Sequence, residues 1–115
     1  MDIENFRDMC LKLGNVTEKT PFGKFAKRYE SILVFYVAGH MFCFIDMNDF
    51  TFVNVRLTPD EIDDFRLKYD SVSRPINQSL KYWIQLNFGG DIPDDIIKKA
   101  VKRAYEVVVQ KYSGK

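Results

Sequence analysis

Residues 32–46 decide the fold, and they read ILVFYVAGHMFCFID. Two runs rich in aromatic and β-branched residues, 32–37 and 40–46, are separated by the pair Ala38-Gly39. A two-residue link that contains glycine between two such runs predicts a tight antiparallel β-hairpin. Because both runs are apolar at nearly every position, we expect helices to cover one face of the sheet and the other face to be either partly covered or lined with aromatic rings.

Outward from this hairpin, the sequence predicts further strands on both sides. Residues 50–55 follow a turn at 47–49 and alternate toward a third strand, and residues 82–88 alternate until Gly89-Gly90. Residues 16–25 are expected to be a short extended segment. Residues 71–81 contain Pro75 and are expected to be irregular or an edge strand.

Three helices complete the expected architecture, over residues 3–13, 59–69 and 94–112. Asp2 caps the first helix, and Thr58 with Glu61 forms a capping box at the start of the second. Amphipathic helices at both ends of the chain need a sheet face on which to bury their apolar sides. We therefore predict an α+β fold, a two-layer antiparallel sheet covered by helices in the order α-β-β-β-α-β(β)-α.

Length and composition limit the class of protein. The chain has 115 residues, of which 46% are hydrophobic and 29% charged, so we expect a single globular domain over residues 1–115. Seventeen Lys and Arg balance sixteen Asp and Glu, which excludes a bulk polycation and requires a local patch for any acidic partner. The acidic start lacks a signal-peptide pattern, and no apolar stretch reaches the length of a membrane span. We expect a cytoplasmic protein that does not contact membranes.

The residues of catalytic and metal chemistry are scarce in this sequence. His40 is the single histidine, and its odd spacing from Cys43 predicts that the two point to opposite faces of a strand. Cys10 and Cys43 do not form a disulfide framework. The acidic cluster Asp60, Glu61, Asp63 and Asp64 favours a solvated helix start over a metal site. We expect no enzyme, no metal and no cofactor.

The residues best suited to binding lie between Arg56 and Trp83. Cations hold phosphates and flat rings stack on bases, so Arg74, Lys81, Tyr82 and Trp83 together suggest contact with nucleic acid, and Arg56 is expected to join them. The alternative for Trp83, the only tryptophan, is a place in the core. Two other basic groups, Lys24 to Arg28 and the lysines of the last helix, are expected to be solvated surface.

Several short motifs follow one another along nearly the whole chain. They are Gly14-Asn15-Val16-Thr17-Glu18, Pro21-Phe22-Gly23, Ala38-Gly39-His40-Met41-Phe42, Val53-Asn54-Val55-Arg56, Lys81-Tyr82-Trp83, Gly90-Asp91-Ile92-Pro93-Asp94 and Ala104-Tyr105. Their order and spacing together resemble the MmcQ/YjbR family of small bacterial proteins. The sequence departs from the family pattern at His40 and Arg56, where lysine is usual, and just before Lys81.

This resemblance implies an α+β domain similar to the type III secretion chaperones. Members of the family are commonly labelled DNA-binding, by the similarity of their paired hairpins to a double-wing motif. Two hypotheses follow. The first is a non-enzymatic nucleic-acid-binding domain that uses a cationic and aromatic sheet surface, with phosphate contacts from Arg56, Arg74 and Lys81 and with Tyr82 and Trp83 stacking or packing beside them. The second is a protein-interaction or small-ligand module that uses the aromatic sheet face, in which an uncovered face favours self-association.

Overall fold

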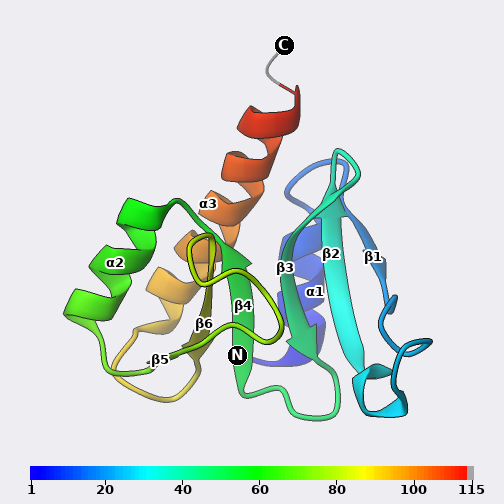
Figure 1. Ribbon diagram of the computed structural model, residues 1–115, viewed down its shortest axis with the longest axis horizontal. Helices are drawn as coiled ribbons and strands as arrows, with labels where there is room; N and C mark the ends of the chain where they lie inside the picture. Colours follow the sequence, from blue (N-terminus) through cyan, green and yellow to red (C-terminus); the bar gives the residue numbers. More distant parts are fainter. Residues whose placement is uncertain (114–115) are drawn as a thin grey trace.

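The computed structural model describes residues 1–113 and has two layers, an antiparallel sheet and helices against one of its faces (Figure 1). The sheet has six strands in the order β1-β2-β3-β4-β6-β5, and every neighbouring pair is antiparallel. The fold class predicted from the sequence is thereby confirmed. The strands are β1 (Thr17–Lys19), β2 (Ile32–Val37), β3 (His40–Asp46), β4 (Phe52–Arg56), β5 (Val72–Ser73) and β6 (Trp83–Asn87).

Three α-helices complete the fold: α1 (Ile3–Leu11), α2 (Pro59–Lys68) and α3 (Asp94–Ser113). Both predicted helix caps are present. Asp2 accepts a hydrogen bond from the backbone N–H of Asn5 at 2.8 Å, and Thr58 and Glu61 form the reciprocal capping box. Among residues 1–113, no helix combines the length and the apolar character needed to cross a membrane.

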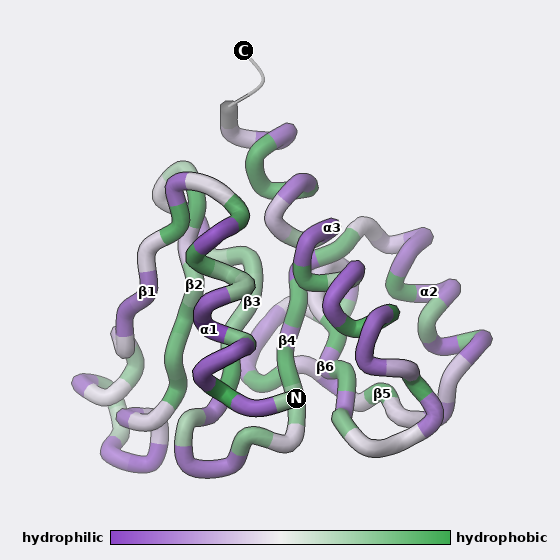
Figure 2. Tube along the Cα trace, turned by 180° about the vertical axis from the view of Figure 1, so that it is seen from behind, coloured by the Kyte–Doolittle hydropathy of each residue, from purple (hydrophilic) through white to green (hydrophobic). Residues whose placement is uncertain are grey.

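The inner face of the sheet packs against α1 and α3, which Figure 2 shows from behind the view of Figure 1. Its core is apolar and tightly closed: Phe35, Val53 and Ile84 from three strands have no exposed surface. Phe6 of α1 meets Phe35 edge-on, with ring centroids 5.9 Å apart. This face is the main hydrophobic core of the domain.

The outer face of the sheet carries a second, smaller cluster that is covered by loops. Ile32, Val34, Phe44 and Trp83 are all at least 96% buried there. The covering segments are the 20–31 loop, which contains a short 3₁₀ helix at Lys27–Tyr29, and the 74–82 loop, which crosses in front of β4 in Figure 1. Both alternatives expected for this face are present together: it is lined with aromatic rings, and loops cover most of them.

A β-bulge in β3 changes which side chains share a face. Phe35 pairs with Cys43 whereas Tyr36 pairs with Met41, so Phe42 is an extra residue on β3. Phe42 and Cys43 both enter the inner core in consequence. The expectation that His40 and Cys43 point to opposite faces is wrong, because the extra residue shifts the alternation by one. His40 stacks on Tyr112 of α3, on the inner side.

The motif Gly90-Asp91 has a structural role in the connection between β6 and α3. The Asp91 carboxylate accepts hydrogen bonds from the backbone N–H groups of Asp70 and Ser71, and these bonds lower its pKa. A Cβ atom at position 90 would lie only 1.7 Å from the Ser71 hydroxyl oxygen, so glycine is required for this close approach. The motif thus ties the segment before β5 to the segment before α3.

Candidate nucleic-acid interface

Two of the predicted binding segments meet where β4 ends and β6 begins. Arg56, the last residue of β4, pairs with Trp83, the first residue of β6. The backbone N–H of Leu57 donates to the carbonyl of Tyr82 at 3.0 Å, which fixes Tyr82 beside the end of β4. The capping box at Thr58 then turns the chain into α2. The pairing of β4 with β6 therefore places Arg56 and Tyr82 side by side at this end of the sheet.

Three cations surround the ring of Tyr82, whose exposed fraction is 36%. The Arg56 guanidinium carbon and the Lys81 ammonium each lie 5.5 Å from its centroid, and the Lys111 ammonium lies 5.7 Å away. Distances below about 6 Å are typical of cation–π contacts. None of the three cations has a carboxylate partner within the described residues. The positive charge around Tyr82 is therefore not neutralised by a neighbouring carboxylate among these residues.

This arrangement continues along α3 as a row in which cations and rings alternate. Lys111 also lies 5.5 Å from the centroid of Tyr112, so its ammonium stands between the two tyrosines. Tyr112 in turn stacks on His40, with centroids 3.4 Å apart and planes inclined by 9°. We call this set the cation–aromatic row; it comprises Arg56, Lys81, Tyr82, Lys111, Tyr112 and His40.

A groove of about 310 Å³ opens beside the row, between the start of α2 and the C-terminal half of α3. Arg56, Tyr82 and Lys111 line it together with Arg103. Arg103 is already paired, because its Nε donates to Glu61 Oε2 at 2.7 Å. Burial raises the pKa of Glu61, but hydrogen bonds from Arg103 and Thr58 outweigh burial and leave that pKa lowered. This ion pair fixes the groove wall and leaves the charge of the row to the other three cations.

The structure brings together three of the five predicted site residues, Arg56, Lys81 and Tyr82. Arg74 is exposed, but it follows the edge strand β5 and so lies two strands from Arg56. Trp83 is 4% exposed and packs against Phe44, with ring centroids 5.6 Å apart. Trp83 is thus not available to stack on a base; it takes the core position that was its alternative.

Three members of the row, His40, Lys111 and Tyr112, were not identified as binding residues from the sequence. Tyr112 follows Tyr105 and Val108 at helical spacing, and this pattern predicts a place on the apolar side of the last helix. The lengths of the helix and the strands do indicate that its end is not covered by the sheet. The 20 residues of α3 span about 30 Å, whereas a strand of five to seven residues spans roughly 17–23 Å. The last turns of α3 therefore extend past the sheet, as Figure 1 shows.

Polar side chains of the outer face form a chain of hydrogen bonds that runs from buried Asn54 to the exposed edge of the sheet. Asn54 has no exposed surface; its Oδ1 accepts from the backbone N–H of Ile76 at 3.1 Å, and its Nδ2 donates to Gln85 at 3.2 Å. Gln85 donates to Asn87 at 2.9 Å, and Asn87 donates to Ser73 at 2.8 Å. Asn54 of the Val53-Asn54-Val55 motif thus fastens the 74–82 loop to the sheet.

The acidic residues at the start of α2 are largely paired with bases. Besides the Glu61–Arg103 pair, Asp64 lies 3.1 Å from the Lys68 ammonium and Asp63 lies 4.0 Å from Arg66. Within residues 1–113 no group of three or more histidine, cysteine, aspartate or glutamate side chains is arranged to hold a metal ion. The carboxylates support the start of the helix, where its dipole favours negative charge.

A known protein family has a model that matches the sequence of this chain. The YjbR family model matches residues 11–107, most of the chain. The chain belongs to the YjbR family. Comparison with curated proteins gives no match.

Among solved structures, the Deinococcus radiodurans protein DR2400, with a DUF419 domain, is similar with a TM-score of 0.82 at 19% identity. The match covers 95% of this chain and 79% of that one. A Pseudomonas syringae protein is similar in its crystal structure, with a TM-score of 0.70 at 15% identity, covering 93% of this chain and 98% of that one. Its solution NMR structure gives 0.67 at 14% identity, covering 93% and 92%. At these identities the likeness shows that the fold is shared, and nothing about function.

Proposed function

We propose that this YjbR-family protein is a binding domain for single-stranded nucleic acid, and that the cation–aromatic row is its contact surface. The observation that carries the proposal is the Lys111 ammonium between the rings of Tyr82 and Tyr112. Phosphates and bases alternate along a single strand, so a surface on which cations and rings alternate complements it. A duplex hides the faces of its bases, and the row is therefore better matched to unpaired bases.

The residues that catalysis would use are engaged in other contacts, which favours a binding protein over an enzyme. Burial raises the pKa of the Cys43 thiol well above its ordinary value, and the adjacent Cys10 thiol raises it further, so Cys43 is a poor nucleophile at neutral pH. His40 is stacked on Tyr112. Glu61 is paired with Arg103.

Self-association through the aromatic face has less support than it had from the sequence. That idea required an uncovered Phe and Tyr surface, but Phe44 and Trp83 are 1% and 4% exposed beneath the two loops. Only Phe25 among the aromatic residues of these loops is largely exposed, at 74%. The covered face therefore favours the binding of a small or extended ligand over a second copy of the chain.

The proposal is tested by the salt dependence of binding to a labelled oligothymidine of about 12 nucleotides, with a duplex of equal length for comparison. Neutralising three phosphates on a single strand gives a slope of about −2 for log affinity against log salt. We expect micromolar binding at about 50 mM salt that weakens steeply by 200 mM, with the single strand preferred. Salt-insensitive binding, or none in the micromolar range, would overturn the proposal.

Matched variants separate the row from general positive charge. Lys111→Ala should reduce the salt slope by about 0.7, whereas Lys98→Ala, which removes an exposed lysine near the other end of the same helix, should leave it unchanged. Tyr82→Leu should cost about 1–3 kcal/mol of binding free energy through lost stacking, and Tyr82→Phe should retain it. Equal effects of Lys111→Ala and Lys98→Ala would place binding elsewhere on the chain.

A further inference from the structure

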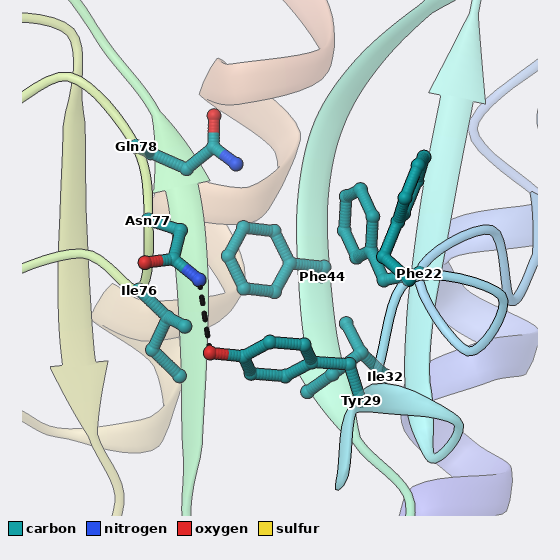
Figure 3. A pocket seen from close by; sticks show the side chains of 8 residues that line it. Phe22, Tyr29, Ile32, Phe44, Ile76, Asn77 and Gln78 are labelled. Carbon is teal, nitrogen blue, oxygen red and sulfur yellow. Dashed lines mark hydrogen bonds between the residues drawn. The ribbon is translucent and has the colours of Figure 1, made fainter. Parts of the chain in front are cut away.

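A pocket of about 180 Å³ lies on the outer face of the sheet, away from the cation–aromatic row and between the 20–31 and 74–82 loops (Figure 3). Strand residues Ile32 and Phe44 form its base, and the two loops supply its walls. The lining is almost entirely apolar and includes four aromatic rings. The apolar lining residues are Phe22, Phe25, Tyr29, Ile32, Phe44 and Ile76.

Hydrogen bonds to side chains fix the loops that form the walls of this pocket. Asn77 Nδ2 donates to the Tyr29 hydroxyl at 3.1 Å and so joins two loops that are 48 residues apart in the sequence (Figure 3). The backbone N–H of Ile76 donates to the buried Asn54 side chain and anchors the same loop to β4. A pocket that is already formed spares a ligand the cost of ordering the loops.

The size of the pocket and its lining select one aromatic ring as the occupant. An engineered protein cavity of about 150 Å³ binds benzene, so about 180 Å³ accommodates a ring with a short substituent. Aromatic rings pack well edge-on or offset against other rings, which Phe22, Tyr29 and Phe44 provide.

Cations beside two of the lining rings favour one kind of substituent. The Lys24 ammonium lies 5.2 Å from the centroid of Phe25, and the Arg28 guanidinium carbon lies 4.8 Å from that of Tyr29, so both cations stand over rings that line the pocket. The 20–31 loop carries one further cation, Lys27, against a single carboxylate, Glu30. An aromatic cage for a cationic ligand would have the opposite rim charge, so an anionic head group is favoured.

A polar group also faces the mouth of the pocket. Gln78 is partly buried and reaches toward the Phe44 ring (Figure 3), and within residues 1–113 its amide has no hydrogen-bond partner. Its amide N–H is therefore free to donate to a carboxylate oxygen. We propose that the outer-face pocket is a binding site for a small aromatic carboxylate, with the ring inside and the carboxylate held by Lys24, Arg28 and Gln78.

Three probes that share one ring and differ in their head group test this proposal, which is independent of nucleic-acid binding. Phenylacetate, 2-phenylethanol and 2-phenylethylamine are titrated into the full chain and followed by amide NMR shifts and by the fluorescence of Trp83, which packs in the same outer cluster. We expect phenylacetate to bind about five- to tenfold more tightly than the alcohol, because hydrogen bonds to charged groups are stronger. The amine should bind most weakly, and the shifts should map to residues 22–32 and 76–78.

Two variants complete the test. The double variant Lys24→Gln with Arg28→Gln changes only exposed positions and should lower the affinity for phenylacetate to that for the alcohol. Ile76→Trp should fill the pocket and abolish binding of all three probes; if it does not fold, the double variant still decides. The proposal is overturned if the amine binds as tightly as phenylacetate, if no saturable shift occurs up to about 20 mM, or if the shifts map to the cation–aromatic row.

Discussion

The two faces of this sheet are closed in different ways. Helices α1 and α3 cover the inner face, and its core residues, such as Phe35 and Val53, are fully buried and apolar. Two loops cover the outer face, where the buried amide of Asn54 and a pocket of about 180 Å³ lie beside the aromatic cluster. Both faces bury the residues at their centre, but only the helical cover forms a continuous apolar interior.

The difference follows from where the backbone of each cover finds its hydrogen bonds. A helix satisfies its own peptide groups and can press an apolar stripe on the sheet, whereas a loop brings peptide groups that need partners. On the outer face, the Asn54 side chain supplies that partner for the N–H of Ile76. Loop cover thus requires polar groups inside the cluster, and its looser packing leaves room for a ligand.

The largest expected effect compares one phenylalanine on each face. Phe35→Ala should lower the free energy of unfolding by about 3–5 kcal/mol, since Phe35 has no exposed surface and the helices above it cannot collapse into the cavity. Phe44→Ala should cost about 1 kcal/mol less, because the loops beside the existing pocket can close over it. Urea unfolding of both variants measures this. An equal or larger loss for Phe44→Ala would show that the outer cover is as rigid as the inner one.

The second test removes the polar support of the outer cover. Asn54→Ala should lower the free energy of unfolding by about 1–3 kcal/mol, because the N–H of Ile76 and the amide of Gln85 both lose a buried partner. Hydrogen exchange should also become faster at Ile76. As a control, Ser73→Ala at the exposed end of the same chain of hydrogen bonds should cost less than about 0.5 kcal/mol. Similar losses in the two variants would contradict the role given to Asn54.

The ion pair between Glu61 of α2 and Arg103 of α3 is expected to contribute less to the free energy of unfolding, and its contribution depends on pH. Glu61→Gln keeps an acceptor for the capping box but removes the charge paired with Arg103, and should cost less than about 1 kcal/mol at pH 7. The folded pKa of Glu61 is lowered, so the stabilisation is present above its ordinary value near 4.5 and is lost as the pH falls through the folded value. Thermal unfolding should therefore separate the two proteins at pH 7 and not at about pH 3. A difference in melting temperature between the two proteins that grows as the pH falls would contradict the lowered pKa of Glu61.

The smallest effect is expected at the contact between the two loops. Tyr29→Phe removes the hydroxyl that accepts from Asn77, and we expect the global free energy of unfolding to change by less than about 0.5 kcal/mol, since Asn77 is exposed. Hydrogen exchange in residues 74–80 should nevertheless become faster while β2 and β4 stay protected. An unchanged exchange rate in this loop would mean that Asn54 alone holds it.

The sequence was sufficient for the elements whose signals are local. The glycine-containing turn fixed the bounds of β2 and β3, and the capping box fixed the start of α2, because these patterns depend on neighbouring residues. The short edge strand β1 lay in the segment expected only to be extended, because its three residues, Thr17–Lys19, pair with the middle of β2 and carry no alternation of their own.

The candidate site was predicted only where it follows from strand pairing. Arg56 and Tyr82 meet because β4 and β6 are neighbours, but Lys111 reaches them from a helix that the strand pattern does not place. Trp83 lies beside exposed Tyr82 and is itself buried, since alternation turns its ring to the outer face, where the two loops cover it. Long-range loop packing of this kind has no signature in a single sequence.

The extra residue Phe42 sets which face of the sheet each side chain at the tip of the β2–β3 hairpin occupies. Inserting or deleting one residue between Gly39 and Cys43 would leave the composition and the strands nearly unchanged, yet it would turn His40 from the α3 side to the loop side. Tyr112 would then lose its stacking partner, and the row would be shortened by one member. The number of residues in this hairpin, more than their identity, therefore decides on which side of the sheet the side chains at its tip lie.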